Sequence, residues 1–112
     1  MIPEHDWRLL RALHRTALDR YCTRVLEECA ATIRKADSTP HDRYLHLFRL
    51  LKERDQRLAS TFDDLRRSTA IQRLAAMVAI GVVTDDEIGG FSVATRESAV
   101  ALAEIQRSSK KP

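Results

Sequence analysis

The sequence predicts an all-α fold, a helical bundle in which a long antiparallel helical hairpin carries short C-terminal helices packed on it. Three observations lead to this prediction. The 112 residues include only 3 Gly and 3 Pro, apolar residues recur at helical spacing through most of the chain, and breaker segments divide the pattern into two long and three short pieces. The content of 44% hydrophobic and 31% charged residues excludes disordered and low-complexity chains.

The first long helix is expected from about residue 4 to residue 36. Apolar or small side chains recur there every three or four residues, at Trp7, Leu10, Leu13, Ala17, Leu18, Tyr21, Cys22, Val25, Leu26, Cys29, Ile33 and Ala36. No Gly or Pro interrupts this pattern, and residues 37–40 then break it. Thr39 suits a helix N-cap and Pro40 suits the first helical position, so a second helix begins here.

The second helix is expected to continue to about residue 64 or 67. One side of this helix follows the a and d positions of a heptad, and every residue on it except Asp55 is apolar. These residues are Tyr44, Phe48, Leu51, Asp55, Leu58, Phe62 and Leu65. Such a seam favours packing along the whole length of a partner helix. Two helices of about 30 residues give a hairpin roughly 45 Å long.

The third helix is expected from Ile71 to Ile80. Thr69 and Gln72 have the spacing of a capping box at its start, and Gly81 is placed to end it.

Two short helical segments follow. Thr84 and Glu87 form a second capping box, which opens one short turn that ends at residues 89–90. The acids of this turn complement the positive end of the helix dipole, so we interpret them as structural rather than metal-binding. Ser92 can cap a last helix that extends to about Arg107.

Charge is balanced over most of the chain. The sequence has 19 basic and 16 acidic residues, and three of the basic residues (Arg107, Lys110 and Lys111) follow the last acid, Glu104. Without these three, residues 1–106 contain 16 basic and 16 acidic groups. We therefore expect one helical domain over residues 1–106 and a disordered basic tail over residues 107–112.

The two cysteines, Cys22 and Cys29, lie seven residues apart on one face of the first helix. Seven residues rise about 10.5 Å along a helix, which excludes a disulfide between them. Two interpretations remain: reduced thiols in the core, or a contact across a dimer interface.

The sequence carries no recognisable catalytic or metal site. It lacks CxxC and HxxxH spacings, a nucleophile elbow and a glycine-rich phosphate loop. Asp42 and His46 have ligand spacing, but at a helix start we interpret them as an exposed pair. His14 is predicted to be a hydrogen-bonded structural residue. We therefore expect a non-enzymatic protein without cofactors.

Asp55 interrupts the apolar seam of the second helix. An unpaired buried carboxylate is unfavourable, so Asp55 fixes the helix register, or lies exposed at a gap between helices, or contacts a ligand. If the hairpin turns near residue 38 or 39, facing residues have numbers that sum to about 77. Tyr21 is then the first candidate to donate a hydrogen bond to Asp55, and Arg24 is the second. Asp55, Tyr21 and His14 form the predicted polar seam.

Two arginine groups are candidate partner-binding surfaces. Trp7 is expected to stack under Arg11. Both groups are explained either by solvated helix faces or by an anionic partner, such as nucleic acid or an acidic protein. The candidate residues of the first group are Trp7, Arg8, Arg11 and Arg15, and those of the second group are Arg66, Arg67 and Arg73.

Together these features favour a protein–protein interaction module that forms a homodimer, because two long helices expose more apolar surface than the C-terminal residues can cover. The alternative is a nucleic-acid-binding accessory or regulatory protein that uses its arginine-rich faces. No apolar run approaches the roughly 18 residues of a membrane span, and the N-terminus lacks a signal-peptide core. We therefore expect a cytoplasmic protein. The 15 Arg against 4 Lys suggest a GC-rich, bacterial coding genome.

Overall fold

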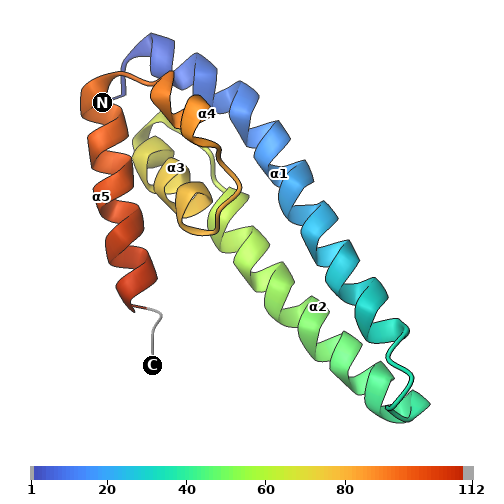
Figure 1. The fold of residues 1–112 in the computed structure, drawn as a ribbon. Helices are drawn as coiled ribbons and strands as arrows, with labels where there is room; N and C mark the ends of the chain where they lie inside the picture. Colours follow the sequence, from blue (N-terminus) through green and yellow to red (C-terminus); the bar gives the residue numbers. More distant parts are fainter. Residues whose placement is uncertain (1, 110–112) are drawn as a thin grey trace.

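The computed structural model describes residues 2–109, and within that range the chain consists of helices and the turns that join them (Figure 1). The predicted all-α fold is confirmed. In chain order the elements are α1 (Glu4–Ile33), α2 (Pro40–Phe62), the 3₁₀ turn η1 (Arg67–Thr69), α3 (Ala70–Ala79), α4 (Asp85–Gly89) and α5 (Val93–Ser109). None of the described helices is long and apolar enough to cross a membrane.

The helix ends are fixed largely by the residues that the sequence indicates. The Thr39 hydroxyl accepts the Asp42 N–H at 3.1 Å, and Pro40 opens α2. At the end of α3, Gly81 adopts a φ of 76°, and its N–H donates to the Val78 carbonyl at 3.0 Å. The Val82 N–H donates to the Met77 carbonyl at 3.2 Å, which completes a Schellman motif.

The capping box predicted for the start of α3 is wrong. The Thr69 side chain does not cap α3. Its hydroxyl instead donates to the Asp64 carbonyl at 2.6 Å and accepts the Arg66 N–H at 3.0 Å. These bonds stabilise the turn before α3, where Asp64 has a φ of 60°.

The core lies where α3 packs against α5 on one side and against α1 and α2 on the other. Leu10, Leu74 and Met77 are fully buried there. Figure 1 shows α3 and α4 beside the N-terminal half of α1 and α5 on the far side of α3, while the tip of the hairpin extends well beyond them. We call residues 22–58 the arm, because they include this tip. The remaining described residues form the body.

The arm makes the molecule elongated. The radius of gyration is 16.3 Å, whereas a compact chain of this length has about 13 Å. The accessible surface is 7405 Å², compared with about 6300 Å² for a typical monomer of this mass. The chain thus exposes roughly 1100 Å² more surface than a compact protein of its size.

The predicted start of the disordered tail is wrong. Helix α5 continues to Ser109, and the Arg107 guanidinium donates to the carbonyls of Val78 and Ala79 at 2.7 and 3.1 Å. Arg107 therefore binds the C-terminal end of α3, where the helix dipole favours a cation. Residues 110–112, the rest of the predicted tail, lie outside the described residues.

Candidate functional site

The hairpin has the predicted register. The Tyr21 hydroxyl donates to the Arg54 carbonyl at 2.9 Å, and the Arg43 guanidinium donates to the Ile33 carbonyl at 2.9 Å. The residue numbers in these two pairs sum to 75 and 76. The expected sum of about 77 is therefore confirmed to within two residues.

His14 joins the two long helices within the body. Its Nε2 lies 2.8 Å from the Phe62 carbonyl oxygen, and its ring meets the Phe62 ring edge-on at 5.5 Å. The prediction that His14 is a hydrogen-bonded structural residue is confirmed.

The predicted hydrogen bond to Asp55 is wrong. Tyr21 donates to the backbone of Arg54, and Arg24 donates to the carbonyls of Ile80 and Gly81 at 2.7 and 3.0 Å. Asp55 is exposed. One residue corresponds to a rotation of about 100° around a helix, so turning Arg54 toward α1 moves Asp55 away from Tyr21.

In this rotation of α2, Arg54 forms an ion pair with α1. The Arg54 guanidinium donates to both carboxylate oxygens of Glu28, at 2.8 and 3.2 Å, and it also contacts Glu53 at 2.6 Å. The hydrogen bonds from Arg54 lower the pKa of Glu28 below its ordinary value. Burial raises the pKa of the neighbouring Tyr21.

The same rotation leaves half of the predicted seam in solvent. Of the residues of α2, all of which the structure describes, only Thr61 and Phe62 are buried. Five large apolar side chains of the arm are between 45% and 66% exposed. We call these five the arm stripe: Leu26, Ile33, Tyr44, Phe48 and Leu51.

An apolar groove lies between α1 and α2 at the base of the arm stripe. It has a volume of about 300 Å³ and is lined by Tyr21, Cys22, Val25, Leu26, Leu51, Arg54, Asp55 and Leu58. Both cysteines are free thiols: Cys29 is buried, whereas Cys22 is half-buried in the groove wall. Asp55 therefore borders an apolar groove instead of pairing across the hairpin.

The second arginine group is engaged within the chain. Arg66 pairs with Asp64 at 2.7 Å, and the Arg73 guanidinium donates to the Ser60 carbonyl. Arg66 is thus engaged in the turn between α2 and α3, and Arg73, on α3, binds the C-terminal end of α2.

Arg67, the third member of that group, binds the N-terminal turn of α1. It pairs with Glu4 at 2.7 Å and lies over the Trp7 ring, 5.8 Å from the centroid. The predicted stacking of Trp7 under Arg11 is therefore wrong, because a cation from a distant part of the sequence occupies that face.

The first arginine group remains on the surface. Arg8, Arg11 and Arg15 border a shallow depression of about 460 Å³ together with Ala12 and Thr16. Arg8 makes a long, exposed contact of 3.6 Å with Glu4. Within residues 2–109, neither Arg11 nor Arg15 forms an ion pair.

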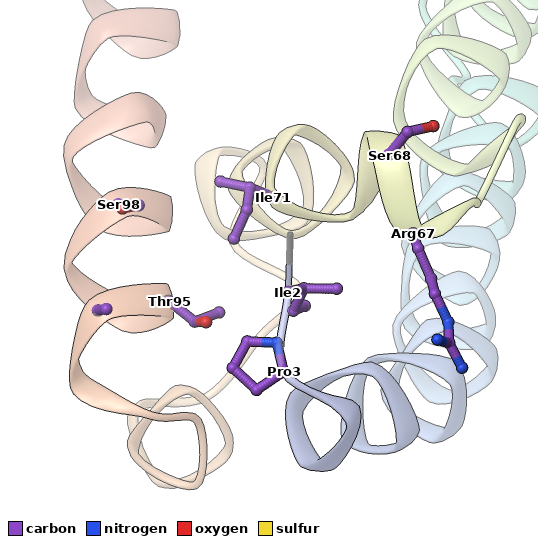
Figure 2. A pocket seen from close by; sticks show the side chains of 8 residues that line it. Ile2, Pro3, Arg67, Ser68, Ile71, Thr95 and Ser98 are labelled. Atoms are coloured by element: carbon purple, nitrogen blue, oxygen red, sulfur yellow. The ribbon is translucent and has the colours of Figure 1, made fainter.

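A second depression, of about 520 Å³, lies between the N-terminus, the start of α3 and the start of α5. Figure 2 shows Ile2, Ile71 and Thr95 around its centre, while the side chains of Arg67 and Ser68 point in opposite directions. Its polar groups do not converge, so the arrangement does not resemble a site built for one ligand.

Among the polar contacts between distant segments that sequence reasoning missed, two involve acidic side chains held by several donors. Asp6, which is fully buried, accepts the Ser92 N–H at 2.9 Å, the Ser92 hydroxyl at 2.5 Å and the Thr95 hydroxyl at 2.6 Å. Burial raises the pKa of Asp6, but these hydrogen bonds outweigh it and lower the pKa below the ordinary value. An acid in the first turn of α1 gives no local signal of a partner 86 residues away.

The second missed contact is bidentate. Arg20 donates to the two Glu87 carboxylate oxygens at 2.6 and 3.0 Å and to the Val82 carbonyl at 3.1 Å. Hydrogen bonds from Arg20, together with the predicted capping bond to the Thr84 N–H at 2.9 Å, lower the pKa of Glu87 to about 2. The capping box of α4 is thus confirmed, and its glutamate also holds α1.

Within the described residues, no group of three or more His, Cys, Asp or Glu side chains is placed to hold a metal ion. No family model matches the sequence, and comparison with curated proteins and with solved structures finds no match.

Proposed function

We propose that the protein is a non-enzymatic helical interaction module that forms a homodimer through the arm stripe. The observation that carries this proposal is the position of the large exposed apolar side chains among the described residues: five lie on the arm, and the other three, Val93, Val100 and Ile105, lie along α5. Large exposed apolar patches mark interaction sites in proteins.

The amount of exposed surface fits one standard interface. The elongated shape leaves roughly 1100 Å² more surface accessible than in a compact monomer, and each partner buries about 800 Å² in a typical stable complex. A contact of ordinary size between two arms is therefore compatible with this shape.

The shape of the stripe favours a second copy as the occupant. A two-fold dimer requires a patch that is complementary to itself. The arm offers both parts on one region: aromatic side chains, Tyr44 and Phe48, that project into solvent, and an apolar groove beside Leu26 and Leu51. Aromatic side chains that fill pockets are typical anchors of protein interfaces.

Sedimentation equilibrium at micromolar concentrations tests the proposal. The wild-type protein is expected at about twice the chain mass of 12.8 kDa, and Phe48→Glu is expected at one chain mass. Ile105→Glu is the matched control, because Ile105 is as exposed as the arm residues, at 64%, but lies on α5. A wild-type monomer across the range contradicts the proposal, as does a Phe48→Glu dimer.

Nucleic-acid binding is the second candidate, and Arg8, Arg11 and Arg15 support it because Arg11 and Arg15 form no ion pair within residues 2–109. Phosphate contacts predict an affinity that falls steeply with salt. A salt titration of DNA and RNA binding, with Arg11→Gln/Arg15→Gln as the variant, tests this candidate. Weak binding that the double variant leaves unchanged contradicts it.

A further inference from the structure

Asp55 is the acidic side chain in the wall of the arm groove. It lies four residues after Leu51 and three residues before Leu58, so all three share one side of α2. Within residues 2–109, no hydrogen bond or ion pair engages its carboxylate, and the side chain is exposed. The neighbouring cation, Arg54, is already paired with Glu28 and Glu53.

We infer that Asp55 limits the strength of self-association and keeps the arm dimer readily reversible. The inference rests on the proposed function, because it concerns the same surface. A second copy that covers the groove removes water from the Asp55 carboxylate, and a carboxylate that loses water without gaining a donor is strongly destabilised.

Symmetry doubles this effect. In a two-fold dimer each copy contributes the same patch, so two carboxylates lose water together. The aliphatic and aromatic members of the stripe favour association, and Asp55 opposes it from within the same surface. Charges placed in this way prevent an exposed apolar face from associating too tightly or with the wrong partner.

The chain offers a direct comparison of variants. Asp55→Leu makes the side of α2 from Tyr44 to Phe62 apolar at every seam position, and Asp55→Asn removes the charge with little change of shape. Asp19→Asn is the matched control, because Asp19 is an exposed acid on α1 that does not line the groove. Circular dichroism verifies that each variant remains helical.

Sedimentation equilibrium over a wide concentration range then measures the dimer Kd of each protein. Asp55→Leu is expected to lower the Kd by about 10- to 100-fold, since each tenfold step corresponds to only about 1.4 kcal/mol. Asp55→Asn is expected to lower the Kd less, and Asp19→Asn is expected to leave it unchanged. Phe48→Glu/Asp55→Leu is expected to be monomeric, which would show that the tightening acts through the arm stripe.

The failure of this inference is distinguishable from the failure of the proposed function. A wild-type dimer whose Kd is unchanged in Asp55→Leu places Asp55 outside the interface and overturns the inference alone. A Kd that rises in Asp55→Asn means that the second copy supplies a cation to Asp55, which also overturns it. Monomers for the wild type and for Asp55→Leu at every concentration overturn both.

Discussion

The body and the arm share the same helical periodicity but differ in what their apolar side chains contact. In the body, α3 buries Leu74 and Met77 completely. In the arm, α2 has no buried residue before Thr61. The periodic pattern of apolar residues therefore indicates where helices form. Burial of those residues depends on how many other elements surround each stretch of helix.

The two regions also differ in how their polar groups are used. The C-terminal end of α3 is held by Arg24 and Arg107, which together donate to four consecutive carbonyls from Val78 to Gly81. In the arm, the exposed polar groups include Asp55, which no other described residue engages. These polar groups of the body are thus bound by other residues of the chain, whereas Asp55 of the arm is left for solvent or for a partner.

The largest difference in stability between the two regions is expected when a leucine in each is truncated to alanine. Leu74→Ala opens a cavity in a fully buried site and is expected to lower the free energy of unfolding by about 2–5 kcal/mol. Leu51→Ala, at a site that is 45% exposed, is expected to lower it by less than about 1 kcal/mol. Urea denaturation at a protein concentration below the association range measures both, and equal effects would remove the distinction between body and arm.

A smaller decrease in the free energy of unfolding is expected when the buried carboxylate of Asp6 is removed. Asp6→Ala leaves the Ser92 N–H and two hydroxyls without their acceptor, so it is expected to cost about 1–3 kcal/mol. Thermal denaturation measures the change. Asp37→Ala, at an exposed position in the hairpin loop, is the control and is expected to be nearly neutral.

The Asp6 contact also marks the limit of what the sequence predicts. Helix positions, the Gly81 stop and the hairpin register follow from local patterns, and the structure confirms them. The rotation of α2 does not follow from them, because it depends on contacts between two helices, among them the packing of Leu47 and Leu50 and the pairing of Arg54 with Glu28. A heptad pattern indicates which residues share a side, but not which way that side faces.

A third effect, smaller again, concerns pH. The pKa of Glu87 is lowered to about 2 from 4.5 by its partners Arg20 and Thr84. A carboxylate whose pKa is lower in the folded state stabilises the fold above its unfolded pKa, and this contribution is lost as the pH falls from about 4.5 to 2. With solvent screening of the partly exposed pair, the loss is expected to be about 1–2 kcal/mol.

Glu87→Gln provides the check for the pH effect. Denaturant unfolding from pH 7 to pH 2 is expected to show a shallower loss of stability below pH 4.5 for this variant than for the wild type. Identical pH profiles for the two proteins would mean that the Arg20–Glu87 pair does not link α4 to α1 in solution.

The most direct test of the central claim, that a second copy covers the arm, is amide hydrogen exchange measured at low and high protein concentration. Association stabilises the region that it covers, and the stabilisation increases as the protein concentration rises above the Kd. We expect exchange to slow with concentration in residues 40–55, while exchange in α3 and α5 changes little. Exchange in the arm that does not depend on concentration, or equal slowing in body and arm, would contradict it.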